Sequence, residues 1–420
     1  MNIDVNKQVK QLIYNGIPLI LTGSDTDGGD YDVVITEHPD GTQSLNIVDA
    51  GNGGNGGNGG IIPAYGFVPK TLDDSGCIAG GTWYGKYVTA YSFYNDITDD
   101  YASGDYIGYK GITSIDFADE VSGIGEHAFY RCIHLELTSL PNTLISIGDS
   151  AFYMCRGLDL TSLPESLTDI GDNAFEYCTG LKLISLPNGI PYIRSGVFNS
   201  CTNLALTSLP EGVTSIGVGA FLDCTKLALT SLPEGLYKIN EEAFSGCTNL
   251  ALTYLPESLT TIGNKAFKGC TNLALTSLPK GLTRINEETF YGCTNLALTS
   301  LPEGVTAVGP SAFMGCTNLA LTSLPEGVET FYGQAFSGCT NLKTMTLPST
   351  LIRIGSYAFA NCTGLTTVTF KGKPVSNLVS NETFTNCPRL TTINVPWSQG
   401  EVASAPWGAT NATINYNYKG

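Results

Sequence analysis

Apolar residues recur along most of the chain with a period of 23 residues. Cysteine and phenylalanine mark this period most clearly, because eleven cysteines lie 23 residues apart and a phenylalanine precedes each of them by three positions. These cysteines are Cys132, Cys155, Cys178, Cys201, Cys224, Cys247, Cys270, Cys293, Cys316, Cys339 and Cys362. A unit of this length has too few apolar residues to bury them alone, so neighbouring units must stack into one continuous core. The pattern therefore predicts a solenoid.

The repeat that starts at Cys201 shows which side chains are expected to point inward. Its recurring apolar positions are Leu204, Leu206, Leu209, Val213, Ile216, Ala220 and Phe221. Pro210 lacks the backbone N–H that a ladder needs and is expected where a strand ends, whereas Gly217 is expected in a turn. Each repeat is therefore expected to form one coil.

This pattern resembles the BspA-like leucine-rich repeats, whose units run C-x-x-L-x-x-I-x-I-P-x-x-L-x-x-I-G-x-x-A-F. The resemblance covers Cys132–Pro396 and implies a leucine-rich-repeat solenoid of about twelve 23-residue coils. The last three units match the strand of the family, as at Leu342, Met345 and Leu347. The nine units before them read C-x-x-L-x-L-x-x-L-P, so that Thr207 stands where the family has an inward aliphatic residue. The strand register of these nine central coils is therefore open.

The N-terminal part of the chain differs from the repeats. Residues 1–50 are expected to form a small β-rich attachment module, because Tyr31–Glu37 and Thr42–Val48 flank a turn sequence as in a β-hairpin. Residues 51–60 read G-N-G-G-N-G-G-N-G-G and are expected to act as a flexible linker. The sequence thus predicts a separate front module on a hinge.

Residues 61–117 and 397–420 are expected to cap the two ends of a solenoid that occupies residues 118–396. The stretch 61–110 contains eleven aromatic residues. A cap that seals the first coil is the favoured interpretation, and an aromatic surface for sugars or proteins is the alternative. Four aromatic residues are expected to close the last coil: Trp397, Trp407, Tyr416 and Tyr418.

The thirteen cysteines predict a buried ladder of thiols. Their number is odd and no C-x-x-C pair occurs. Equivalent positions on stacked coils point the same way rather than toward each other, which is a poor geometry for disulfides. Some disulfide bonds or a metal site are the less favoured alternatives. Reduced thiols fit assembly in a cytoplasm.

The charge balance limits the classes of partner. The net charge of −17 repels phosphate backbones and anionic lipids, which argues against nucleic-acid and membrane-surface binding. No apolar run approaches the roughly 18 residues that a membrane-spanning helix needs. The first thirty residues do not follow the pattern of a secretory signal. Protein or glycan partners are therefore expected.

Motifs for metal binding are weak. The three histidines, His38, His127 and His134, have no partners at the spacing of a catalytic triad or a zinc site. Four aspartates cluster before the hairpin and could bind calcium: Asp25, Asp27, Asp30 and Asp32. Their spacing departs from the EF-hand template, so a solvated loop is the favoured interpretation. No metal and no cofactor is expected.

A pair of carboxylates is the strongest candidate for catalysis. Glu241 and Glu242 recur two coils later as Glu287 and Glu288, and paired carboxylates are used to cleave glycans. Lys265 lies at the equivalent position of the coil between them. This arrangement favours a surface ladder of opposite charges over an active site. We therefore expect no catalytic residues and no enzymatic activity.

Positions that vary between coils are free to meet a partner. The most variable column lies directly before an inward residue and runs Ser146, Asp169, Tyr192, Ser215, Lys238, Thr261, Arg284, Ala307, Thr330 and Arg353. Its large members and their neighbours are the candidate ligand-binding residues: Tyr192, Tyr237, Lys238, Arg284, Tyr332 and Arg353. A plain solvated face is the alternative. The uniform column Thr207, Thr230, Thr253, Thr276, Thr299 and Thr322 is better explained by β-propensity than by glycan or ice binding.

Taken together, these features predict a protein of recognition or adhesion. The first hypothesis is a phage or prophage tail protein whose front module attaches to other tail proteins while the solenoid binds a bacterial surface protein or glycan. This places the chain on a virion after synthesis in the bacterial cytoplasm, and the layout resembles prophage tail proteins that bear these repeats. The alternative, implied by the family resemblance, is a cell-surface or secreted adhesin that binds host matrix proteins.

Overall fold

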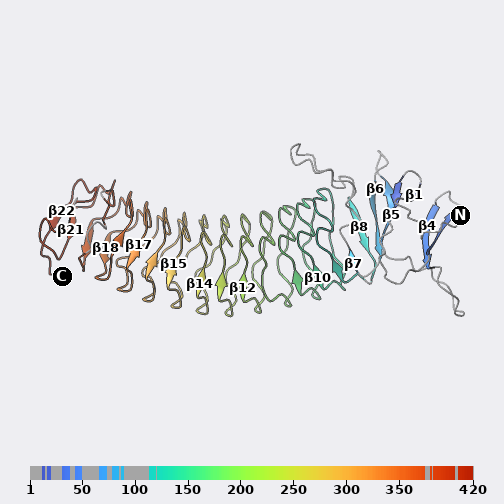
Figure 1. Ribbon diagram of the computed structural model, residues 1–420, viewed down its shortest axis with the longest axis horizontal. Helices are drawn as coiled ribbons and strands as arrows, with labels where there is room; N and C mark the ends of the chain where they lie inside the picture. Colours follow the sequence, from blue (N-terminus) through green and yellow to red (C-terminus); the bar gives the residue numbers. More distant parts are fainter. Residues whose placement is uncertain are drawn as a thin grey trace.

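In the computed structural model the repeats form one gently curved rod of stacked coils (Figure 1). The residues described are those of the strands β1–β7 within the first 88 residues, and residues 113–119, 121–373, 379–380, 382–402 and 405–419. No helix occurs among them. The solenoid predicted from the 23-residue period is confirmed.

All regular elements are strands. Those before the coils are β1 (Leu12–Tyr14), β2 (Ile17–Leu19), β3 (Tyr31–Glu37), β4 (Gln43–Asp49), β5 (Gly66–Leu72), β6 (Ile78–Tyr84) and β7 (Tyr87–Val88). Those that follow are β8 (Ser114–Phe117), β9 (Gly123–Ile124), β10 (Ser146–Ile147), β11 (Asp169–Ile170), β12 (Ser215–Ile216), β13 (Lys238–Ile239), β14 (Thr261–Ile262), β15 (Arg284–Ile285), β16 (Ala307–Val308), β17 (Thr330–Phe331), β18 (Thr344–Leu347), β19 (Arg353–Ile354), β20 (Thr367–Phe370), β21 (Thr392–Asn394) and β22 (Thr413–Asn415).

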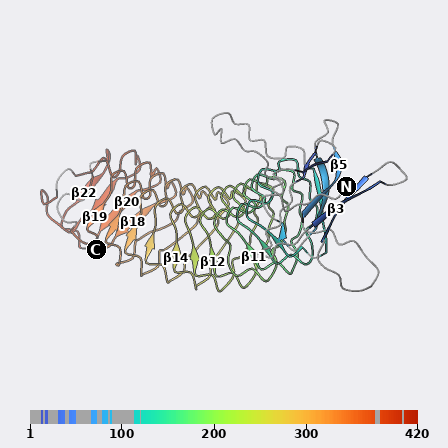
Figure 2. The same ribbon diagram turned by 45° about the vertical axis from the view of Figure 1, so that its right-hand side comes forward.

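One row of very short parallel strands runs along the rod, on its lower side in Figures 1 and 2. Most strands of this row pair in register with the equivalent residues of the next coil, as Lys238 pairs with Thr261 and Ala307 with Thr330. The paired strands form three successive sheets: β7 with β9–β11, β12–β14, and β15–β17 with β19. In most of these strands the first residue faces outward and the second, such as Ile239, points into the core, whereas Ala307 is itself buried. This row therefore displays one side chain per coil at a regular spacing.

Among the described residues, a second row of strands is present only at the two ends of the rod, as β8 before the first coil and as a longer set in the last coils. Strands β18, β20, β21 and β22 pair in parallel there, and Met345 and Leu347 of β18 point inward. In the central coils Leu206 is buried instead, while Thr207 and Ser208 are both exposed. Two successive outward residues break the alternation that a strand requires. The open question of register is thus resolved: the chain bends at the position of Thr207.

Phenylalanine rings form a continuous stack through the core. From Phe129 to Phe384, rings in successive coils have centroids 5.1–5.8 Å apart and planes within 15° of parallel. Near-parallel planes at such centroid separations correspond to offset stacking, the favourable arrangement for aromatic pairs. Each ring is fully buried, so the stack joins the coils into one core.

The cysteines form the predicted ladder of free, buried thiols. From Cys155 to Cys387, each thiol donates a hydrogen bond of 2.9–3.1 Å to the backbone carbonyl of the phenylalanine in the preceding coil. Burial raises the pKa of these thiols, to about 12 for Cys132 and about 11 for Cys387. The thiol is small and apolar yet still a weak donor, which explains its use at this position. Cys77 lies outside the described residues.

Successive coils do not approach each other equally. After the inward residue of the strand row, glycine alternates with larger residues in the order Gly171, Arg194, Gly217, Asn240, Gly263, Asn286, Gly309, Tyr332 and Gly355. A Cβ atom at Gly263 would lie 2.4 Å from the backbone nitrogen of Glu241 in the preceding coil. Asn240 has room for its side chain, which donates a 2.7 Å hydrogen bond to the carbonyl oxygen of Ile216. At the position after the inward residue, the structure therefore repeats every two coils.

Replacing Gly263 by alanine is expected to lower the free energy of unfolding by about 1 to 3 kcal/mol, because the added methyl group overlaps backbone that cannot move aside freely. Gly235→Ala is the matched control, since nothing lies within 4 Å of a Cβ atom there. Urea unfolding followed by circular dichroism measures both. Equal stability of the two variants would contradict the close approach of the coils.

Both ends of the rod continue its strand pairing. Before the first coil, β6 pairs in parallel with β8 and β7 with β9, as expected of a cap. At the other end Trp397 and Trp407 are buried and Tyr416 packs against the core, but Tyr418 is 41% exposed. The backbone N–H of Tyr418 still donates a 2.9 Å hydrogen bond to the Val395 carbonyl, and the closing role expected of this residue stays a prediction.

The N-terminal hairpin is also present. Strands β3 and β4 pair antiparallel from Tyr31 with Asp49 to Glu37 with Gln43, which confirms the expected hairpin. The aspartate cluster expected near it and most of the aromatic residues of 61–110 lie outside the residues whose side chains are described. The domain boundaries given above stay predictions.

Candidate binding surface

The strand row presents a continuous outward surface. We call this the strand-row surface and define it as the outward side chains of residues 191–194, 214–217, 237–240, 260–263, 283–286, 306–309, 329–332 and 352–355. It exists because each two-residue strand turns one side chain into the core and its neighbours outward. Its residues vary from coil to coil, whereas the inward residues hardly vary.

All six candidate residues predicted from the sequence lie on this surface. Tyr192 and Tyr237 are 41% and 51% exposed, and Arg284 and Arg353 are also exposed. The remaining two, Lys238 and Tyr332, are half-buried. Strand pairing sets their spacing, because Arg284, Ala307, Thr330 and Arg353 are consecutive partners along the row. The six residues therefore lie on one side of the rod, spread over eight coils from Tyr192 to Arg353, and their role in binding stays a prediction.

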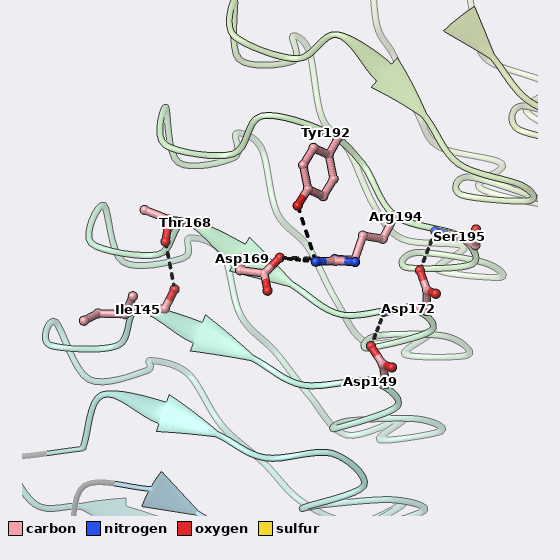
Figure 3. A network of polar contacts seen from close by, with 8 residues as sticks. All are labelled: Ile145, Asp149, Thr168, Asp169, Asp172, Tyr192, Arg194 and Ser195. Atoms are coloured by element: carbon pink, nitrogen blue, oxygen red, sulfur yellow. Dashed lines mark hydrogen bonds and ion pairs between the residues drawn. The ribbon is translucent and has the colours of Figure 1, made fainter.

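Two cationic side chains of the strand-row surface are held by neighbours. Figure 3 shows that Arg194 donates hydrogen bonds of 3.1 and 2.9 Å to one carboxylate oxygen of Asp169 in the preceding coil, and one of 3.4 Å to the Tyr192 hydroxyl. The hydrogen bonds to Asp169 raise the pKa of the Arg194 guanidinium. At the other end, the guanidinium of Arg353 lies 5.4 Å from the ring centroid of Tyr332. Both are fixed before any ligand arrives.

The cations in the middle of the surface are different. Among the described residues, neither Lys238 nor Arg284 has a hydrogen-bond or ion-pair partner for its side chain. Tyr237, next to Lys238, has no aromatic partner in that part of the chain either. Large side chains that reach the surface without such contacts are the groups that a partner protein can use.

The surface is corrugated with a period of two coils. Three coils carry a large residue before the inward position and a non-glycine residue after it: Tyr192 with Arg194, Lys238 with Asn240, and Arg284 with Asn286. Arg353 departs from this rule, because Gly355 follows its inward residue. The coils between them carry small residues at both positions: Ser215 and Gly217, Thr261 and Gly263, Ala307 and Gly309. Ridges of large side chains thus alternate with furrows.

Sequence reasoning missed Arg194 as a member of this surface, and it placed Asp169 in the variable column without identifying its pairing with Arg194. Both belong to the two columns that flank the inward residue, and the alternation of glycine with larger residues was the available signal for Arg194. Their pairing depends on side-chain conformations that span two coils, which periodicity alone does not specify.

The paired carboxylates form a charge ladder, as the sequence predicts. Lys265 lies 3.1 Å from Glu242, and Glu288 is bound by Lys268 at 2.7 Å rather than by Lys265. Glu242 and Glu288 are thus each engaged in an ion pair with a lysine. His127 lies 3.3 Å from Glu126, and no group of three potential metal-ligating side chains occurs in the described ranges.

The threonine column lies on a different part of the coil. Thr207 and its equivalents are exposed at the bend and do not reach the core. The threonines that directly follow most of the cysteines form their own ladder, in which the Thr248 hydroxyl donates to the Thr225 carbonyl and the Thr271 hydroxyl to the Thr248 carbonyl. These hydroxyls serve the contacts between coils.

The geometry defines a leucine-rich-repeat solenoid with a variable outward strand row. Comparison with known families agrees, because the BspA type leucine rich repeat region matches residues 106–228, 220–343 and 283–405. The chain belongs to this family. Leucine-rich repeat proteins of this type are generally binding scaffolds without catalytic activity, and they generally bind other proteins.

Solved structures share the fold. A leucine-rich repeat protein from Bacteroides ovatus is 23% identical with a TM-score of 0.51, over 84% of this chain and 98% of that one. The pneumococcal vaccine antigen PcpA is 18% identical with a TM-score of 0.52, over 93% and 97%. A leucine rich cell surface protein from Faecalibacterium prausnitzii is 25% identical, with a TM-score of 0.44 over 83% and 96%.

The comparison with curated protein sequences gives no match. Within the described residues, no helix has the length and apolar character that crossing a membrane requires.

Proposed function

We propose that the chain is a non-enzymatic recognition protein that binds a bacterial surface protein or glycan through the strand-row surface. The observation that carries this proposal is the contrast within each coil. The inward residues Ile239, Phe244 and Cys247 recur almost unchanged, whereas the outward column varies and leaves Lys238 and Arg284 without partners in the described part of the chain. A scaffold with a constant core and a variable face suits recognition.

We further propose that a phage or prophage tail carries the solenoid, with the front module attached to other tail proteins. The separate hairpin of β3 and β4 and the glycine-asparagine sequence 51–60 between it and the coils support this arrangement. A flexible linker would let the rod reach a cell surface at varied angles. The chain would then be located on the virion.

Binding of the fluorescently labelled full chain to bacterial strains and to immobilised host matrix proteins tests the proposal. Saturable labelling of particular strains supports a receptor on bacteria, and co-purification with tail particles after lysis supports the tail assignment. Binding to matrix proteins alone would replace the tail assignment by that of a cell-surface or secreted adhesin.

Replacing Tyr237 and Arg284 together by serine is expected to weaken this binding about tenfold without lowering the melting temperature, because both side chains are exposed and are of types that dominate protein interfaces. The matched control replaces Tyr254 and Lys280, which are exposed but lie outside the strand-row surface. Full binding by the first variant would remove this surface from consideration.

A further inference from the structure

The strand-row surface can recognise a ligand only through side chains. Its backbone groups are already used between coils, as in the hydrogen bonds from the Gly217 nitrogen to the Ile193 oxygen at 2.7 Å and from the Asn240 nitrogen to the Ile216 oxygen at 3.0 Å. An added β-strand needs a free sheet edge, which the side of a solenoid does not offer. A ligand lying along the rod must therefore match the spacing of the ridges.

That spacing selects one conformation of an extended polypeptide. Two coils separated by the usual distance between strands place successive ridges about 9.6 Å apart. In a polyproline II helix every third side chain points in the same direction, and three residues advance about 9.3 Å along the axis. Two turns of an α-helix advance about 10.8 Å, and two residues of a β-strand advance about 6.7 Å. Over three intervals the mismatch is about 0.9 Å for polyproline II and about 3.6 Å for the α-helix.

The side chains on the ridges indicate which residue type a polyproline II ligand carries at every third position. Tyr192 and Tyr237 lie on successive ridges and Tyr332 lies two ridges beyond Tyr237, and aromatic side chains are what polyproline II segments dock against. Lys238 and Arg284 sit on neighbouring ridges with unengaged charges in the described part of the chain. Glu241 and Glu287 lie three residues after these cations on the same coils, so a row of negative charge runs beside the row of positive charge. A ligand that carries its acidic residues on one side only can meet the cations while it keeps those residues away from the glutamates.

We propose that the strand-row surface binds a proline-rich, polyproline II segment of a partner protein with an acidic residue at every third position, aligned with the rod axis. The acidic residues pair with Lys238 and Arg284. The prolines next to them pack on Tyr237, which neighbours Lys238, and on the tyrosines of the adjoining ridges, Tyr192 and Tyr332. This inference rests on the proposed recognition function and names the chemistry of its partner.

Fluorescence anisotropy of a labelled peptide of repeated Pro-Pro-Glu units, titrated with the full chain, tests the inference. Saturable binding is expected, weakened about tenfold or more when Lys238 and Arg284 are both changed to glutamate. Lys226→Glu with Lys280→Glu is the matched control, because these lysines lie on the same two coils outside the surface and the change in charge is identical. A Pro-Pro-Lys peptide and an isomer with all prolines before all glutamates complete the set.

Two results would overturn the inference: no binding of the Pro-Pro-Glu peptide, or equal binding of the isomer with grouped glutamates. The same charge-reversal variants are tested on the cells and matrix proteins. Loss of cell binding by the strand-row variant without any peptide binding would sink this inference while leaving the recognition function in place. Unchanged cell binding by that variant would overturn both.

Discussion

Raising the pH from 8 to 10 is expected to unfold the solenoid. Burial raises the pKa of the described cysteines above the ordinary value of 9.0, so the folded thiols stay protonated where unfolded ones ionise. The folded state then binds more protons, and its stability is full below pH 9 and falls as the pH rises above that value. At pH 10 each buried thiol lowers the free energy of unfolding by about 1.4 kcal/mol relative to its value at neutral pH. The ladder as a whole loses an amount on the order of the stability of a domain.

Urea unfolding in the presence of a reductant, followed by circular dichroism at pH 7, 8, 9 and 10, measures this effect. The variant Cys247→Ala is the control, because it removes one buried thiol and should lessen the loss of stability by about the share of one group. Identical urea midpoints at pH 7 and pH 10 would show that the thiols are not buried as a ladder.

Replacing Phe244 by alanine is expected to lower the free energy of unfolding by about 3 to 5 kcal/mol. The ring is fully buried and stacks on Phe221 and Phe267 at centroid distances of 5.4 and 5.5 Å, so its removal leaves a cavity and breaks the stack. Because the stability of a solenoid depends on contacts between neighbouring coils, the loss should also reduce the cooperativity of unfolding. Thermal and urea unfolding measure both quantities.

An exposed aromatic residue provides the comparison for this variant. Tyr254 is 44% exposed, and Tyr254→Ala is expected to change the free energy of unfolding by no more than about 0.5 kcal/mol. A melting curve of Phe244→Ala that matches the parent would refute the inward placement of the phenylalanine column.

The core could be predicted because each inward residue recurs at a fixed distance. Phe244 and Cys247 are recognisable from their period alone, and both are buried as expected. The location of the strands was harder to predict. The leucine segment around Leu206 was the expected strand in the central coils, yet the short strands lie at Lys238–Ile239 and its equivalents. Two outward residues at the bend decide this, and apolar spacing alone allows either register.

Other features depend on the backbone path and not on the apolar pattern. Each coil contains two residues with positive φ, and Glu242 and Lys265 occupy one of these positions at 55° although neither is glycine. Turn predictions that rely on glycine overlook such residues. The hydrogen bond from each thiol to a phenylalanine carbonyl also requires the stacked geometry. The period of the sequence therefore predicts the buried cysteines but not the carbonyl groups that accept their hydrogen bonds.

The candidate surface could be predicted in part. Comparing coils within the chain identified Tyr192, Lys238 and Arg284, because variation at one position stands out against a constant core. It did not reveal which cations are already engaged. Arg194 is held by Asp169 across a coil boundary, while Arg284 is left exposed without such a contact in the described ranges.

The measurement that tests the central claim most directly is lysine acetylation of the full chain, free and bound to the cells or matrix protein that it recognises. It needs no substitution, so misfolding cannot imitate the result. Protection of Lys238 in the bound protein, with Lys182, Lys226 and Lys280 modified as in the free protein, is the result that the strand-row surface predicts. Unchanged modification of Lys238 with protection elsewhere on the rod would contradict it.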